Sequence, residues 1–141
     1  LRNSSAASDV YKRQLYDGAQ ETLELLGKHF KLIAITNGNA DLNKIGLRHL
    51  FYDVVTAVDV GFAKPDKRIF QEAIKKSKVN TEEIIHVGDN PEADIFGAAN
   101  VGLGTVWMNS QQLEWPKKYQ KPDMTIVNIS ELCNLLIPKI N

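Results

Sequence analysis

The sequence has a single cysteine, no long apolar run and no excess of either charge. Cys133 cannot form an internal disulfide, and the apolar residues around it predict a helix face in a protein core. No run approaches the ~18 apolar residues of a membrane-spanning helix, and the first residues do not resemble a signal peptide. Lys+Arg and Asp+Glu number 17 each, so no strong net field attracts nucleic acid or an anionic membrane. These absences favour a cytoplasmic protein that binds neither nucleic acid nor a membrane.

The first residues look foreign to the rest of the chain. Residues 1–14, LRNSSAASDVYKRQ, lack a periodic apolar pattern, whereas a well-patterned segment starts at Leu15. We expect residues 1–14 to be a non-native or disordered leader and residues 15–141 to form one domain. An adapter or vector sequence translated ahead of a truncated gene would explain this leader and the lack of an initiator Met. A genuine disordered tail is the alternative.

From Leu15 onward, helical and strand patterns alternate along the chain. Helices are expected over residues 17–27, 39–49, 66–77, 91–100 and 131–137, and strands over residues 32–35, 54–58, 84–87, 105–108 and 125–127. The strands are apolar on consecutive residues, which is typical of strands buried on both faces. The alternation predicts a Rossmann-like doubly wound α/β fold with a parallel sheet. Ligands of such folds bind beyond the carboxyl ends of the strands.

Polar residues follow the first two predicted strands. In ITNGN, Thr36 offers a hydroxyl, and amides freed by Gly38 can point together toward an anion. In GFAKPD, the side chain of Lys64 can reach the same crevice, because Pro65 holds the preceding backbone extended. Taken separately, the first is an ordinary turn and the second a solvated lysine.

Two carboxylates follow the third strand in GDNPEAD. Asp89 stands at the strand end, and Asp94 lies five residues later at the start of a helix. Mg²⁺ prefers such hard oxygen ligands and takes only one or two protein carboxylates. Individually, Asp89 could be a turn residue and Asp94 a favourable charge in a first helical turn. Together with the two preceding loops, they indicate phosphoryl chemistry.

ITNGN, the Lys of GFAKPD and GDNPEAD resemble the second, third and fourth motifs of haloacid dehalogenase-like hydrolases of subfamily IA. The resemblance covers nearly everything from Leu15 onward. LYDGAQETL and ITNGNADL are similar to flavin mononucleotide and riboflavin-pathway phosphatases. The resemblance implies a phosphatase that binds Mg²⁺ and transfers the phosphoryl group of a small phosphorylated metabolite to an aspartate of the enzyme, which forms an aspartyl-phosphate intermediate. Flavin mononucleotide or a related sugar or nucleotide phosphate is the candidate substrate.

The resemblance also assigns roles to individual residues. Thr36 and Lys64 would be catalytic, since Thr36 would donate to the phosphoryl oxygens and Lys64 would stand between nucleophile and phosphate. Asp89 would bind the metal directly, and Asp94 would hold a metal-bound water or orient the lysine. The implied site residues are Thr36, Asn37, Gly38 and Lys64 for the phosphate and Asp89 and Asp94 for the metal.

The family's first motif, Asp-x-Asp-x-Thr or -Val, does not occur in the sequence, and neither does the helical cap that follows it in many relatives. The missing strand would be central, between the strands that end at Thr36 and Val87. Ile33, Ile35, Ile85 and Val87 would then line an open slot that invites aggregation or a partner strand. We expect this chain to be a marginally stable, inactive fragment of the phosphatase.

Other interpretations remain open at this point. A dehalogenase of the same fold needs no metal and gives no reason for the two carboxylates of GDNPEAD. A receiver domain should carry its acidic pair near the first strand and its lysine near the last. A non-catalytic remnant could bind a phosphate-bearing ligand or a partner through its open sheet. His86, in a strand with no titratable neighbour in sequence, is interpreted as a core histidine.

Overall fold

The computed structural model describes residues 18–38 and 42–138, so the expected leader at residues 1–14 lies outside the described residues. The chain forms two compact units. The sheet unit comprises residues 33–40 and 53–128, and the helical unit comprises residues 1–32, 41–52 and 129–141. Across the described ranges, no helix is long and apolar enough to cross a membrane.

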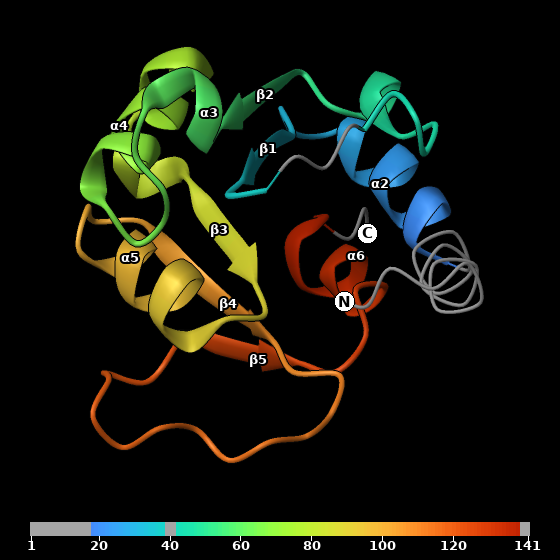
Figure 1. The fold of residues 1–141 in the computed structure, drawn as a ribbon. Coiled ribbons are helices and arrows are strands. Elements are labelled where there is room, and N and C mark those ends of the chain that lie inside the picture. The colour runs from blue at the N-terminus through green and yellow to red at the C-terminus, as the bar shows by residue number, and fades with distance from the viewer. Residues whose placement is uncertain (1–17, 39–41, 139–141) are drawn as a thin grey trace. The chain divides into compact units, whose positions relative to one another are not determined.

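All strands of the described residues lie in the sheet unit and pair in parallel (Figure 1). Their bounds are β1 Ile33–Thr36, β2 Asp53–Thr56, β3 Ile85–Gly88, β4 Gly104–Met108 and β5 Met124–Ile126. One sheet has the order β1-β2 and the other has the order β3-β4-β5. Parallel strands that alternate with helical segments from β1 to β4 confirm the predicted α/β class.

Each sheet has a strand with one unpaired edge. β1 pairs only with β2, and β3 pairs on one side only with β4, within the part of the chain that the structure describes. This arrangement agrees with a parallel sheet that lacks a central strand between β1 and β3. Ile85 of β3, which the sequence predicted to line an open slot, is 42% exposed, and among the described residues no strand pairs with β3 on that side.

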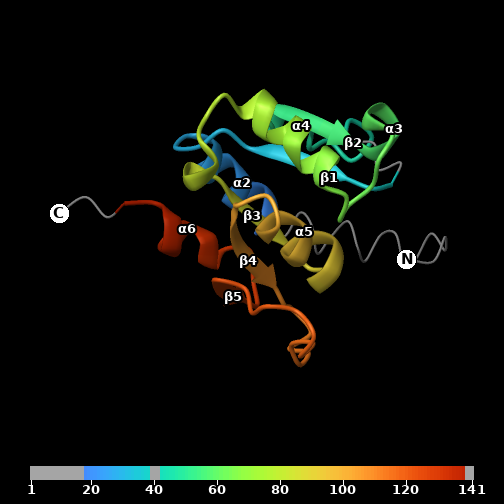
Figure 2. The ribbon, with the colours of Figure 1, turned by 90° about the vertical axis from the view of Figure 1, so that its left-hand side faces the viewer.

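Helices of the sheet unit carry most of its core. Their bounds are α3 Ala57–Val60, α4 Lys67–Ser77, the 3₁₀ turn η2 Thr81–Glu83, the π-helical segment η3 Pro91–Phe96 and α5 Gly97–Ala99. α4 lies against β1 and β2 (Figure 2). Its start is fixed by the side chain of Asp66, which accepts a hydrogen bond from the backbone N–H of Arg68.

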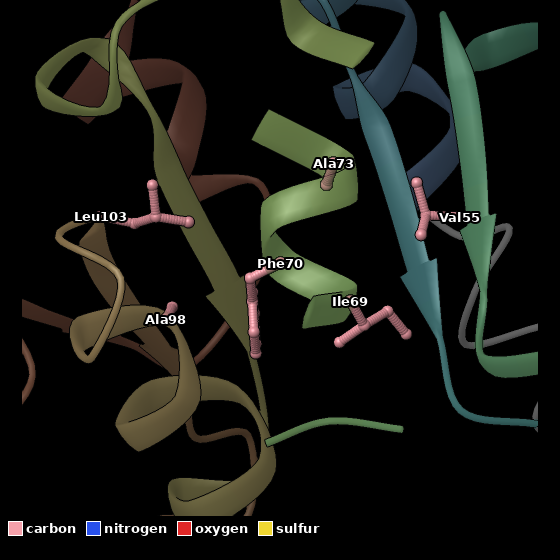
Figure 3. Close-up of a cluster of buried hydrophobic side chains, with 6 residues drawn as sticks. All are labelled: Val55, Ile69, Phe70, Ala73, Ala98 and Leu103. Atoms are coloured by element: carbon pink, nitrogen blue, oxygen red, sulfur yellow. The ribbon is translucent and has the colours of Figure 1, made fainter. Parts of the chain in front are cut away.

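The core of the sheet unit forms on the apolar face of α4. Figure 3 shows Ile69 on the side of α4 that faces Val55, and Phe70 on the side that faces β3. Both side chains have no exposed surface, as the apolar periodicity of residues 66–77 predicted. The buried cluster consists of Val55, Ile69, Phe70, Ala73, Ala98 and Leu103.

One predicted strand ends earlier than expected, and one predicted helix is wrong. The strand predicted over residues 54–58 ends at Thr56, because the Thr56 hydroxyl accepts a hydrogen bond from Asp59 N–H and caps α3. The helix predicted over residues 39–49 is a series of turns from residue 42, followed by the 3₁₀ turn η1 at Arg48–Leu50. Gly46, with φ of 74°, interrupts the helical path there.

The helical unit contains α2 (Ala19–Gly27) and α6 (Glu131–Leu136), which contact one another, and η1, which contacts α2. α2 begins at Ala19 rather than at residue 17 and ends at Gly27 as predicted, with Leu26 only 4% exposed. Leu132 is the buried residue of α6. Cys133 lies on α6 as predicted and is half-buried, so it is less enclosed than the core position that the sequence predicted.

Candidate phosphate-binding site

Asn37 joins the loop after β1 to the backbone of Lys64. The Asn37 Oδ1 accepts a hydrogen bond from Lys64 N–H at 2.7 Å, and its Nδ2 donates to the Lys64 carbonyl at 3.1 Å. A side-chain amide can bond both backbone groups of one residue in this way. Asn37 was predicted to contribute its own backbone amide, and its side-chain role was missed because residues 27 positions apart carry no local signal.

Thr36 is the last residue of β1, and its side chain shapes the turn that follows. Its hydroxyl accepts a hydrogen bond from Gly38 N–H at 3.2 Å. This ST-type turn holds the loop after β1, where Asn37 and Gly38 are exposed. Thr36, Asn37 and Gly38 therefore lie together as predicted, beside the backbone of Lys64.

Asp94 is the centre of a buried hydrogen-bonded cluster. Its side chain is 5% exposed, and its Oδ1 accepts hydrogen bonds from Lys64 Nζ at 2.6 Å and His86 Nε2 at 3.0 Å. Its Oδ2 accepts a hydrogen bond from Asn90 N–H at 3.1 Å. A charge-assisted bond to a buried carboxylate is among the stronger interactions in a protein. Lys64 and Asp94 therefore come together as the sequence predicted.

Gly88 and Asn90 shape the space around this carboxylate. A Cβ atom on Gly88 would fall 2.2 Å from the Asp94 Cγ, so only glycine leaves room for the carboxylate. The Asn90 Oδ1 accepts hydrogen bonds from the N–H groups of Glu92 and Ala93 and caps η3. The Asn90 carbonyl accepts from Asp94 N–H and Ile95 N–H, which gives the segment its wide π-helical start.

The ionisation of Asp94 follows from these contacts. Burial raises the pKa of Asp94, but the hydrogen bond from His86 and the charge and hydrogen bond of Lys64 outweigh it. The pKa of Asp94 is thereby lowered to about 2 from the ordinary value of 3.8. Asp94 is an ionised acceptor at neutral pH.

We expect this ionised carboxylate to make stability depend on acid pH. The pKa of Asp94 is 3.8 when unfolded and about 2 when folded, so its contribution is full above pH 3.8 and is lost as the pH falls to about 2. The loss is on the order of 2 kcal/mol. Urea denaturation of the wild type and of Asp94→Asn between pH 2 and 6 measures this loss of unfolding free energy. Equal pH dependence in the two proteins would contradict this assignment.

Asp89 differs from Asp94 in its surroundings. Its residue is exposed at the carboxyl end of β3, and its backbone carbonyl accepts a hydrogen bond from Trp107 Nε1 at 2.9 Å. The Trp107 ring is buried and packs edge-on against Trp115, with 4.9 Å between ring centroids. Trp107 therefore holds the turn that carries Asp89, and Trp115 packs against Trp107.

The carboxylates of Asp89 and Asp94 differ in how accessible they are to a divalent cation. Both oxygens of Asp94 already accept hydrogen bonds, whereas the exposed carboxylate of Asp89 is accessible. No group of three or more His, Cys, Asp or Glu side chains suited to a metal occurs within residues 18–38 and 42–138. Mg²⁺ keeps several waters and needs few protein carboxylates, so Asp89 fits as one ligand of such an ion.

Comparison with known proteins identifies the family. The family model of haloacid dehalogenase-like hydrolases matches residues 7–102. The pyrimidine 5'-nucleotidase YjjG of Escherichia coli is 35% identical over 125 residues, which cover 84% of this chain and 55% of that protein. The 5-amino-6-(5-phospho-D-ribitylamino)uracil phosphatase YigB of E. coli is 33% identical, over 82% of this chain and 48% of that protein. The chain spans about half the length of the curated relatives it matches.

Solved structures of the same family share the fold. A 2-haloacid dehalogenase from Pseudomonas syringae pv. Tomato superposes with a TM-score of 0.82 and 41% identity, over 86% of this chain and 52% of that one. The HAD-hydrolase YfnB from Bacillus subtilis, bound to magnesium, superposes with a TM-score of 0.80 and 30% identity, over 86% of this chain and 56% of that one. These matches confirm the resemblance found in the motifs. The chain belongs to the haloacid dehalogenase-like hydrolases.

Proposed function

We propose that this chain supplies the phosphate-binding and metal-binding part of a Mg²⁺-dependent phosphatase that hydrolyses small phosphate monoesters. The observation that carries the proposal is the ion pair between the half-buried Lys64 and the buried Asp94, together with the hydrogen bonds from Asn37 that hold the backbone of Lys64. In this proposal the Lys64 ammonium group would act together with the turn after β1, where Asn37 and Gly38 are exposed. Positive charge and oriented amides are what a phosphoryl group requires.

Each residue of this site has a distinct part in the proposed reaction. The backbone amides after Thr36 and the Thr36 hydroxyl would donate to the phosphoryl oxygens, while Lys64 would offset their negative charge. Asp94 holds Lys64 in place rather than touching the substrate. Asp89 would hold Mg²⁺, which, when bound, would neutralise charge on the transferred group.

The proposed reaction also needs a nucleophile that the recognised motifs of this chain do not include. An aspartate oxygen would attack phosphorus as the ester P–O bond breaks, and the departing alkoxide would take a proton from a second carboxyl group. Water would then attack the aspartyl-phosphate, give up its proton to that carboxylate and release inorganic phosphate. Both carboxyl groups belong to the Asp-x-Asp motif that the sequence lacks.

The activities of two relatives and the chemistry of the site support a class of substrate. YjjG is a pyrimidine 5'-nucleotidase and YigB is a phosphatase of a phosphoribitylamino-uracil. A small phosphorylated metabolite of this kind, including flavin mononucleotide, is the proposed substrate class. Such metabolites are charged and do not cross membranes freely, which favours a cytoplasmic location.

Phosphate binding tests the proposed function directly. We expect Lys64→Met to weaken the binding of inorganic phosphate to the full chain at least about tenfold, because it removes the half-buried ammonium group. Lys75→Met is the matched control, since Lys75 lies exposed on α4. Isothermal titration calorimetry with phosphate, in the presence and absence of Mg²⁺, measures the phosphate affinity of both variants. Equal affinity of Lys64→Met and wild type would contradict the proposal.

We expect the purified chain to release no phosphate from monoesters, because the nucleophile is not among its recognised motifs. The measurement is colorimetric phosphate release from nucleotide, sugar-phosphate and flavin mononucleotide substrates with Mg²⁺. Substantial Mg²⁺-dependent turnover would overturn this expectation. A non-catalytic remnant would also bind phosphate without turnover, and coding sequence upstream that encodes paired aspartates would exclude that alternative.

Dehalogenation is the second candidate, favoured by the 41% identity to a structure described as a 2-haloacid dehalogenase. The structure also weakens one argument against it, because Asp94 is engaged by protein donors and does not pair with Asp89 as a second open ligand. The two functions differ in what the chain should bind. Phosphate affinity that rises with Mg²⁺ supports the phosphatase, whereas binding of a 2-haloacid without Mg²⁺ supports the dehalogenase.

A further inference from the structure

His86 is half-buried in β3, next to the candidate site. Its side chain is 12% exposed, and its ring meets the Phe70 ring edge-on at 5.2 Å between centroids. Its Nε2 lies 3.0 Å from the Asp94 Oδ1. The sequence predicted a core histidine, and its packing against Phe70 agrees with that prediction. The contact with Asp94 was missed, because Asp94 lies eight residues away along the chain but beside His86 in space.

The ionisation of Asp94 determines which atom donates in the hydrogen bond between His86 and Asp94. An ionised carboxylate can only accept hydrogen bonds, so the proton must be on the His86 Nε2. That nitrogen is thereby occupied, and the burial of the ring keeps it from reaching a substrate. Any effect of His86 on the reaction must pass through Asp94.

Asp94 in turn is held by donors of unequal rigidity. His86 is anchored in a strand, and Asn90 donates from the backbone, so these two donors fix one oxygen each. The close approach of Gly88 limits movement of the carboxylate on another side. Lys64, in contrast, reaches the Oδ1 through a flexible four-carbon stem. The fixed donors therefore orient the carboxylate, and the carboxylate orients the ammonium group.

We propose that His86 is a positioning residue that locks the Asp94 carboxylate and, through it, the Lys64 ammonium group in the orientation that binds phosphate. The phosphate part of this inference rests on the proposed function. The geometric part, that His86 strengthens the Lys64–Asp94 pair, stands without it. A histidine that only filled the core would leave the pair unchanged when replaced by an apolar side chain of similar size.

The first experiment measures binding of inorganic phosphate to the full chain carrying His86→Leu or His86→Gln. His86→Leu removes the donor and should weaken binding about tenfold, whereas the Gln amide can donate from the position of Nε2 and should stay within about twofold of wild type. His49→Leu is the matched control, since His49 lies exposed in η1 of the helical unit.

The second experiment measures the Lys64–Asp94 coupling energy without phosphate. A double-mutant cycle of Lys64→Met and Asp94→Asn, followed by urea denaturation, is run with His86, with His86→Gln and with His86→Leu. We expect the coupling to be retained with Gln and to fall to about half or less with Leu. Unchanged coupling with Leu overturns the inference. If Lys64→Met binds phosphate as wild type does, the proposed function fails, and the cycle still decides the role of His86.

Discussion

Replacing Phe70 with Ala is expected to lower the free energy of unfolding by about 4 kcal/mol. Phe70 has no exposed surface, and its ring lies in the buried cluster between α4 and β3 (Figure 3). A Cβ on Gly97 would fall 2.6 Å from the ring, so the backbone at Gly97 already packs closely against it. Truncation therefore leaves a cavity and also removes the edge-on support of the His86 ring. Urea denaturation followed by tryptophan fluorescence measures the loss.

Phe62→Ala provides the matched control for this prediction. Phe62 is 37% exposed, and its ring meets the Arg68 guanidinium, with 3.2 Å from the guanidinium carbon to the ring centroid. Loss of an exposed cation–π contact should cost about 0.5–1 kcal/mol. Equal destabilisation by the two substitutions would show that the cluster around Phe70 does not dominate the stability of the sheet unit.

Gly88→Ala is expected to lower the free energy of unfolding by about 3 kcal/mol and to abolish detectable phosphate binding. The added methyl group would overlap Asp94, whose Cγ, Cβ and Oδ2 would lie 2.2, 2.4 and 2.5 Å from it. Asp94 cannot move without breaking its bonds to Lys64, His86 and the Asn90 backbone. A displaced and still buried carboxylate without these donors is costly.

Gly27→Ala serves as the control for a glycine-to-alanine change. A Cβ on Gly27 would meet its nearest atoms at 3.8 and 3.9 Å, which is ordinary contact. Gly27 is the last residue of α2, and alanine has the higher helix propensity there, so we expect a neutral or slightly stabilising effect. A stable Gly88→Ala protein with unchanged phosphate affinity would show that the Asp94 cluster tolerates rearrangement.

Much of the fold could be predicted from local patterns. α2, α4 and α6 were located by apolar periodicity, because one face of each helix is buried in its own unit. β4 was located by a consecutive apolar run, and Val106 and Trp107 are buried as expected. The failures occurred where a single contact decided the backbone path, as at Thr56, whose hydroxyl starts α3 inside an apparent strand.

The candidate site could be predicted only in part. Thr36, Lys64 and Asp89 follow strand ends in sequence, so the architecture placed them near the carboxyl edge of the strands. The role of His86 had no local signal, since its partner Asp94 lies on the next element of the fold. Asn37 was named for its backbone and works also through its side chain, which holds Lys64 at both backbone groups.

The sequence by itself determined the α/β class, the family and the residue types available for phosphoryl chemistry. These follow from periodicity and from short motifs, which are properties of neighbouring residues. The tertiary structure decided how the two acidic residues differ: Asp94 is buried among Lys64, His86 and Asn90, while Asp89 is exposed. Burial and hydrogen-bond partners depend on which distant segments meet, and no local pattern encodes them.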